Sequence, residues 1–153
     1  MPFDLHLRDL VDGDYPVLFE LQRDPAASRM AAFGTRDPDA GELAARWKGS
    51  RAVGKAIVVD GAVVGFVASF LLEGEPQVTY WIAREHWGRG IASAALSRFL
   101  QGFPARPVYA SAARDNVGSL RVLAKCGFRT LGSSKAFASA RGEDVEEVFL
   151  RLD

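Results

Sequence analysis

Residues 86–96, with the sequence HWGRGIASAAL, place glycine, alanine and serine around one arginine, just before an aliphatic run. The segment follows residues typical of a strand and opens a run with helical periodicity. The first backbone N–H groups of a helix lack partners and carry the positive end of its dipole, so they bind anions well. Small side chains would let a phosphate reach these groups, and Arg89 would add charge. The same glycines also fit a helix packed closely on a sheet, so the segment alone leaves both interpretations open.

Two common nucleotide-binding motifs are excluded at this position. A phosphate-binding loop of the Walker type needs Gly-Lys-Ser or Gly-Lys-Thr after its glycines, and the chain contains neither. A dinucleotide fingerprint needs Gly or Ala where Ser93 stands, and it follows a βαβ unit rather than hairpins. The expected ligand is therefore a phosphate compound of another kind.

The elements that must position this segment follow from periodicity and turn residues. Strands are expected at residues 3–8, 55–59, 62–72, 77–83, 107–113, 130–137 and 145–152. Helices are expected at residues 12–24, 39–50, 90–102 and 116–127, and residues 25–40 read as a loop-like stretch or a short helix before a cap at Asp39. The Asp-Gly pair at 60–61 suits a type I′ turn. The order βααβββαβαββ predicts an α/β (α+β) fold: a single domain over residues 1–153, with a mixed, mostly antiparallel twisted sheet of about seven strands flanked by about four helices.

Composition excludes several classes of partner. The 19 basic and 19 acidic side chains balance, so nothing indicates a nucleic-acid partner. One cysteine excludes an internal disulfide and fits a reducing compartment. The N-terminus lacks a signal pattern, and no apolar run approaches the ~20 residues of a membrane span. We therefore expect a cytoplasmic protein without nucleic-acid or membrane partners; whether it forms a homodimer stays open.

Two segments together resemble the GCN5-related N-acetyltransferases (GNAT). The family's acetyl-CoA motif reads Gln or Arg, two residues, Gly, one residue, then Gly or Ala. WGRGIA, residues 87–92, matches this motif except that Trp87 replaces the polar first residue. The Trp-Gly pair is similar to the ribosomal-protein N-terminal acetyltransferase subgroup, and NVGSLRVLAKCGF, residues 116–128, resembles that subgroup's Asn-x-x-Ser…Lys-x-Gly-Phe helix. The resemblance covers residues 55–152 well and the N-terminal third only by topology.

The resemblance implies an acyl-CoA N-acyltransferase fold and direct acetyl transfer from acetyl-CoA to an amine, without a metal. Backbone N–H groups near Trp81 and Ile82 would face the thioester oxygen, and those of residues 88–92 would hold the diphosphate. Asn116 and Ser119 are the expected catalytic residues, at the pantetheine arm and near the sulfur; taken alone they would equally be an N-cap and a first-turn surface residue. The expected cofactor-binding residues are Trp81, Ile82, Ala83, Trp87, Gly88, Arg89, Gly90, Ile91, Ala92, Ser93, Asn116 and Ser119.

Two departures from the family pattern bear on the chemistry. Many members have a tyrosine that acts as the general acid seven residues after the asparagine, where this chain has Leu123. Ser119 is therefore the expected proton donor or thiolate partner. The subgroup often carries a glutamate at the start of the motif strand, where Gln77 could only hold a water. Glu73 and Glu75 fall in an expected turn, where solvated carboxylates are usual.

The absence of an obvious base bears on the acceptor. Deprotonating a lysine at neutral pH costs ~4.6 kcal/mol, whereas an α-amine costs only ~1 kcal/mol. The sequence therefore favours a protein or peptide N-terminal α-amine as the acceptor. A small-molecule amine and a non-catalytic acyl-CoA-binding role are the alternatives. Met30, Phe33 and Gln77 are expected to line the amine cleft, although packing explains the first two equally well.

Overall fold

The structure is a computed structural model that describes residues 3–31, 39–49, 52–138 and 141–153. Its seven strands are β1 (Leu5–Asp9), β2 (Val53–Val59), β3 (Ala62–Leu72), β4 (Glu75–Ile82), β5 (Val108–Ala113), β6 (Arg129–Ala138) and β7 (Glu143–Leu152). Its helices are α1 (Asp14–Gln22), α2 (Pro25–Ala31), α3 (Ala40–Gly49), α4 (Ile91–Gln101), α5 (Val117–Lys125) and the 3₁₀ turn η1 (Arg84–His86). The described part of the chain contains no helix that is long and apolar enough to cross a membrane.

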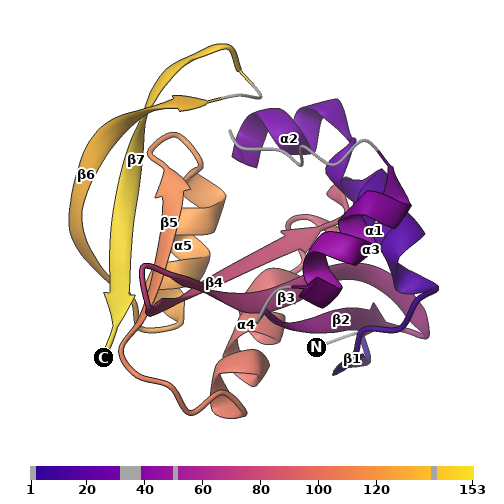
Figure 1. The fold of residues 1–153 in the computed structure, drawn as a ribbon. Coiled ribbons are helices and arrows are strands. Elements are labelled where there is room, and N and C mark those ends of the chain that lie inside the picture. Colours follow the sequence, from indigo (N-terminus) through magenta and orange to yellow (C-terminus); the bar gives the residue numbers. More distant parts are fainter. Residues whose placement is uncertain (1–2, 32–38, 50–51, 139–140) are drawn as a thin grey trace.

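The seven strands form one sheet in the order β1-β2-β3-β4-β5-β7-β6 (Figure 1). Every neighbouring pair is antiparallel except β4 and β5, which run parallel. These two strands share a single register pair, Gln77 with Tyr109, and then diverge. The sheet therefore consists of two well-paired halves, β1–β4 and β5–β7–β6, with a gap between them.

Helices cover both faces of the sheet. The larger core packs α4 and α5 on one face, with fully buried Ile57, Val67, Leu96 and Val108 at its centre. A second cluster packs α1 and α3 on the other face against Phe66 of β3. The amphipathic helices thus bury their apolar stripes on opposite sides and place the starts of α4 and α5 on the same side of the sheet.

The expected architecture is confirmed in its class, its seven strands and its antiparallel hairpins. Asp60 and Gly61 have φ angles of 51° and 84°, as a type I′ turn requires. Asp39 caps α3, because its Oδ1 accepts from Glu42 N–H at 2.8 Å. Residues 25–40, which were expected to be a loop-like stretch or a short helix, contain the short helix α2, with Pro25 at its first position, where a missing N–H costs nothing.

Candidate active site

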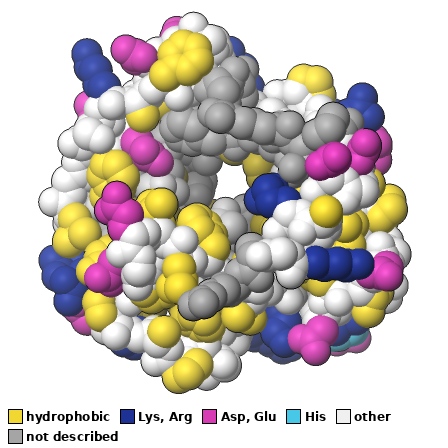
Figure 2. Space-filling model, viewed as in Figure 1, with side chains coloured by type: hydrophobic (Ala, Val, Ile, Leu, Met, Phe, Trp, Pro, Cys, Tyr) yellow, Lys and Arg dark blue, Asp and Glu magenta, His cyan; other side chains and the backbone are white. Residues whose placement is uncertain are grey.

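A cavity of about 780 Å³ lies where β4 and β5 diverge. Figure 2 shows the molecule hollowed at its centre in this view. We call the side of the cavity formed by residues 86–93 and 115–123 its α4–α5 end. We call the side formed by α2 and by residues of β5 and β7 its α2 end, because α2 packs on β5 and β5 pairs with β7. The volume is in the range of small-molecule binding sites.

Helix α4 begins at the cavity without a side-chain cap. Its N-cap, Gly90, has a left-handed φ of 78°, and no described side chain accepts from its first-turn N–H groups. Gly88 has a φ of 79°, and a Cβ added there would meet no atom within 4 Å. Ala92 and Ser93 line the same wall. The turn therefore needs glycine for its backbone shape, and it leaves helix N–H groups next to open space, which is a suitable site for an anion.

The open edge of β4 presents backbone groups to the gap. Ala83 N–H donates to Val64 O of β3 at 2.8 Å, so odd-numbered residues of β4 bond toward β3. By the alternation of an antiparallel ladder, Tyr80 and Ile82 direct their N–H and C=O groups toward β5 instead. Of the N–H groups expected at a thioester oxygen, that of Ile82 faces the gap. The N–H groups of Trp81 and Ala83 do not face the gap, because both residues belong to the β3 side of the ladder.

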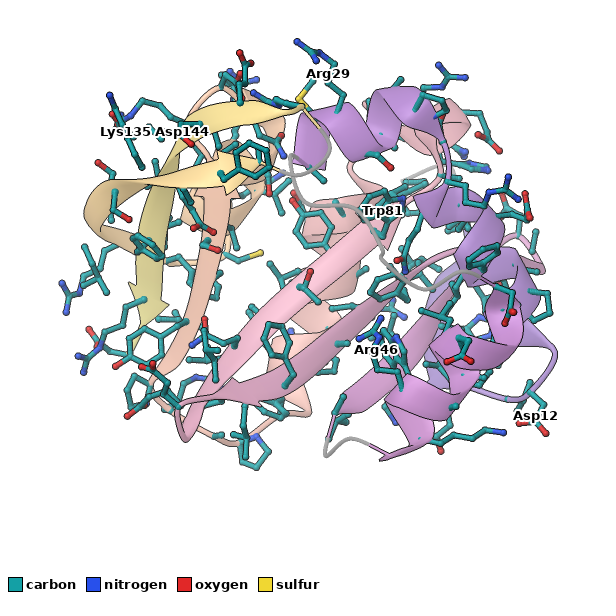
Figure 3. All side chains as sticks on the ribbon, turned by 45° about the horizontal axis from the view of Figure 1, so that its top comes forward. Asp12, Arg29, Arg46, Trp81, Lys135 and Asp144 are labelled. Atoms are coloured by element: carbon teal, nitrogen blue, oxygen red, sulfur yellow. The ribbon has the colours of Figure 1, made fainter. Side chains whose placement is uncertain are left out.

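Trp81 of β4 and Trp87, which follows η1, are both held in the cavity wall by hydrogen bonds from their indole N–H groups. The Trp81 indole N–H donates to Leu21 O of α1 at 3.2 Å and joins the core cluster of α1 and α3 (Figure 3). The Trp87 indole N–H donates to Ile82 O at 2.9 Å. Each indole therefore fixes a turn or helix against the strand, and each residue also lines the cavity.

Arg89 differs from its expected role. Its guanidinium lies 2.9 Å from His86 Nδ1 and stacks over the Phe3 ring at 5.6 Å. Arg89 does not line the cavity, whereas His86 does. The Arg89 guanidinium, which was expected at the phosphates, instead points toward the N-terminal segment, where it contacts the Phe3 ring and the His86 imidazole.

Helix α5 begins at the cavity with a side-chain cap. Asn116 Oδ1 accepts from Ser119 N–H at 3.2 Å, so the asparagine is the N-cap of α5 and has only its amide Nδ2 left to donate to a ligand. The Ser119 hydroxyl lies 2.9 Å from the Tyr80 hydroxyl. Burial raises the pKa of Tyr80 above its ordinary value, so the phenol stays protonated at neutral pH.

Tyr80 is a site residue that sequence reasoning missed. Tyr80 lies two residues from each of the buried residues Val78 and Ile82 on β4, so its side chain is on the same, inward face as theirs. The polar end of an inward-facing tyrosine needs a partner, and this was the available signal. Its partner Ser119 is 39 residues away, so spacing alone could not identify the pair.

The α2 end of the cavity carries a second missed residue, Glu147 of β7. The Ser111 hydroxyl of β5 donates to Glu147 Oε2 at 2.8 Å, and both residues line the cavity. Met30 and Gln77, which were expected to line the amine cleft, both line this cavity. Phe33, the third residue expected there, lies outside the described residues.

Arg141 connects α2 to Asp115, a residue of the cavity wall. Its side chain is only 6% exposed, and its Nε donates to Arg29 O at the end of α2 at 2.7 Å. Its two terminal nitrogens donate to the Asp115 carboxylate at 2.5 and 2.8 Å. We call this arrangement the Arg141 clasp; Figure 3 labels Arg29 where α2 meets the end of the β6–β7 hairpin. The clasp lowers the pKa of Asp115 through these hydrogen bonds.

Most of the expected site residues share this one cavity. Ala83 and Arg89 do not line it. The expected site residues that do line it are Met30, Gln77, Trp81, Ile82, Trp87, Gly88, Gly90, Ile91, Ala92, Ser93, Asn116 and Ser119.

Comparisons with known proteins extend this picture. The family described as acetyltransferase (GNAT) domain matches residues 4–129. Among curated proteins, no sequence matches the chain. The fold is similar to a phosphinothricin acetyltransferase from Sinorhizobium meliloti in complex with AcCoA, with a TM-score of 0.83, 21% identity, and coverage of 97% of this chain and 87% of that one.

Two further solved structures have the same fold but are named for different acceptors. A ribosomal-protein-alanine N-acetyltransferase from Brucella melitensis gives a TM-score of 0.82 at 19% identity, covering 96% of this chain and 98% of that one. A spermidine N-acetyltransferase from Vibrio cholerae, with CoA and spermine, gives 0.78 at 20% identity, covering 96% and 95%. These likenesses show the fold and do not confirm the ribosomal-protein subgroup. Because the family match spans most of the chain, including the N-terminal third, the chain belongs to the GNAT family of N-acetyltransferases.

Proposed function

We propose that this enzyme transfers the acetyl group of acetyl-CoA directly to a primary amine inside the cavity between β4 and β5. The observation that carries the proposal is the Tyr80–Ser119 hydroxyl pair, 2.9 Å apart. The pair lies in the wall of a cavity that has helix N–H donors at one end and a carboxylate at the other. It supplies the proton that a departing thiolate requires.

The residues of the α4–α5 end fit acetyl-CoA. When bound, acetyl-CoA supplies the acetyl group as a thioester. The first-turn N–H groups of α4, after Gly88 and Gly90, would hold the diphosphate, because they lack side-chain acceptors and lie beside open space. Ile82 N–H faces the gap and would donate to the thioester oxygen. The Asn116 amide would donate to the pantetheine arm.

The Tyr80–Ser119 pair holds a proton near the sulfur. Burial keeps Tyr80 protonated, and its hydroxyl is hydrogen-bonded to Ser119, which the Asn116 cap fixes in the first turn of α5. Ser119 would pass its proton to the sulfur and take one from Tyr80, and the proton lost by the acceptor nitrogen as the amide forms would restore the Tyr80 hydroxyl. This arrangement replaces the tyrosine that the family pattern places at position 123.

The acceptor would enter at the α2 end, and two acceptor types fit. A protein or peptide N-terminal α-amine costs little to deprotonate and carries no adjacent carboxylate. A small-molecule amine is supported by the Arg141 clasp, which ties α2 to Asp115 of the cavity wall and so restrains the separation of these two parts. The two types differ in bulk beyond the first residue.

An acceptor panel tests the proposal. The purified protein with acetyl-CoA is assayed for thiol release against short peptides, matched amino-acid amides and simple amines, with hydrolysis subtracted. We expect amine-dependent thiol release in at least one class. Activity with amides but not with peptides of the same first residue would assign the small-molecule type. Binding of acetyl-CoA without turnover for any amine would overturn the proposal.

A further inference from the structure

The charge of the cavity wall is unbalanced. Among the described residues that line it, Asp115 and Glu147 are carboxylates, and none is lysine or arginine. Asp115 is already paired with Arg141 through two hydrogen bonds. Glu147 forms no ion pair with any described residue. The wall therefore carries one uncompensated negative charge, at the α2 end.

Glu147 is held in place by its neighbour on β5. Strands β5 and β7 pair Ala113 with Glu147, and Ser111 stands two residues from Ala113 on the same face. The Ser111 hydroxyl donates to Oε2 of Glu147, which orients the carboxylate and leaves Oε1 to accept from a ligand. The next residue, Val148, is buried in the main core, so Glu147 faces the opposite side of the sheet, toward α2.

Part of the cavity wall is apolar and exposed. Met30, Phe70 and Leu72 line the cavity and are 42%, 39% and 56% exposed, respectively. Exposed large apolar side chains in a cavity wall indicate a contact with an apolar ligand group. The cavity that holds the Glu147 carboxylate thus also offers apolar surface.

We infer that Glu147 binds the ammonium group of the acceptor and that the cavity selects primary amines whose substituent is apolar and lacks an anionic group. This inference rests on the proposed function, since it concerns the acceptor of that reaction. An ammonium on Oε1 of Glu147 forms a charge-assisted hydrogen bond. A carboxylate next to the amine would approach Glu147 with no described cation of the wall to compensate it.

The class includes arylalkylamines and amino-acid amides, and it excludes free amino acids. Phenethylamine and phenylalanine form a matched pair, because they share the ring and the amine and differ by the carboxylate. We expect wild-type kcat/KM for phenethylamine to exceed that for phenylalanine by about 100-fold or more. Phenylalaninamide, which has a neutral group in place of the carboxylate, should recover most of the difference.

The test compares three variants with the wild type. Glu147→Gln keeps the shape and the Ser111 hydrogen bond but removes the charge. We expect it to raise KM for phenethylamine by about 10- to 100-fold and to reduce the preference over phenylalanine to below about tenfold. Ser111→Ala leaves the charge and loosens its position, so it should give a smaller rise in KM. Glu146→Gln is the control, because Glu146 pairs with Arg114 and does not line the cavity.

The outcomes separate this inference from the proposed function. If the wild type acetylates amines and Glu147→Gln matches it in KM and in preference, the inference is wrong and the proposed function stands. If the wild type acetylates no amine, the proposed function is wrong, and the inference that rests on it is wrong as well. Acetyl-CoA affinity, measured by calorimetry, should be equal in the wild type and in Glu147→Gln. A parallel loss of that affinity in Glu147→Gln would mean that the residue supports the fold of the cavity rather than the acceptor, and would also overturn the inference.

Discussion

The helices α4 and α5 both begin at the same cavity, yet they begin in opposite ways. Helix α5 starts at Asn116, whose side chain accepts from Ser119 N–H, so one of its orphan donors is satisfied within the protein. Helix α4 starts at Gly90, which has no side chain, in a left-handed conformation that other residues adopt at a cost. A helix start that is left without a cap gives up about 1 kcal/mol of stability.

This difference assigns a separate task to each helix. The start of α5 is rigid and holds Ser119 against Tyr80, as a proton-transferring group requires. The start of α4 has unsatisfied donors, as an anion site requires. Variants should therefore separate turnover from cosubstrate affinity, according to which helix they change.

The largest expected effect comes from Tyr80→Phe, which removes the phenol that partners Ser119. We expect kcat to fall by about 100-fold, because a positioned general acid contributes on the order of 10²–10⁴ in rate. The dissociation constant of acetyl-CoA, measured by calorimetry, should stay within about twofold. A variant with unchanged kcat would remove Tyr80 from the mechanism and leave α5 only a structural role.

The pH profile sharpens the same prediction. Burial raises the pKa of Tyr80, so the folded protein retains the phenolic proton to a higher pH than a solvated tyrosine does. As pH rises, the rate should therefore hold through neutral pH and fall only above the ordinary range of tyrosine ionisation. The high-pH limb, measured from kcat, should be absent in Tyr80→Phe. Its persistence there would assign the titration to another group.

The next largest effect comes from adding one negative charge to the start of each helix. Ser93→Asp should weaken acetyl-CoA binding by about tenfold or more through repulsion of the diphosphate, while the free protein is unchanged or slightly stabilised by the helix dipole. Asn116→Asp places the same charge at the start of α5, where aspartate caps as well as asparagine. It also removes the amide donor to the pantetheine arm, so we expect a loss of affinity that is smaller than that of Ser93→Asp but not zero. Equal losses of affinity would show that the diphosphate does not distinguish the two helix starts.

Removal of the α5 cap gives a smaller effect on the free protein. Asn116→Ala should lower the free energy of unfolding by about 1 kcal/mol, because Ser119 N–H loses its acceptor. Denaturant titration measures this change. No loss of stability would mean that the N–H finds water at no cost and that Asn116 is held for a ligand alone.

The smallest effect is expected from Gly118→Ala in the first turn of α5. A Cβ there meets no atom within 4 Å, so alanine should stabilise the free helix by about 0.5 kcal/mol. Gly118 also lines the cavity, so the same methyl group should weaken acetyl-CoA binding a few-fold. Opposite signs in thermal melting and in calorimetry support a ligand against this turn. A gain in stability with unchanged affinity would place the ligand elsewhere.

Local patterns predicted the fold and the α4–α5 end of the cavity. Alternation and the Asp60–Gly61 turn identified the hairpins, and the small residues at 88–93 identified the uncapped helix start, because each signal lies within one short segment. The short helix α2 was left open, since seven residues with weak periodicity give little signal. The side-chain partners of Arg89 and Trp81, Phe3 and Leu21, could not be predicted because they are distant in sequence.

The two missed residues show the limit of reading along the chain. Tyr80 meets Ser119 only because β4 and α5 flank the same gap, and Glu147 meets Ser111 only because β7 pairs with β5 in one register. A shift of one residue in that register would turn Glu147 to the other face. The sequence expectation of a site without an obvious carboxylate considered residues near the motif strand and did not include Glu147 of the last strand, which lines the cavity.

Strands β4 and β5 pair at only one position, Gln77 with Tyr109, and this affects how the sheet responds to a bound ligand. Beyond this pair, the facing edges of β4 and β5 are separate, and their backbone N–H and C=O groups do not pair with each other. If acetyl-CoA binds here as proposed, the amides of its pantetheine arm would pair with these backbone groups only while the cosubstrate is bound. Saturation with acetyl-CoA should then slow amide hydrogen exchange along both β4 and β5. Release of the CoA product should leave these backbone groups unpaired again.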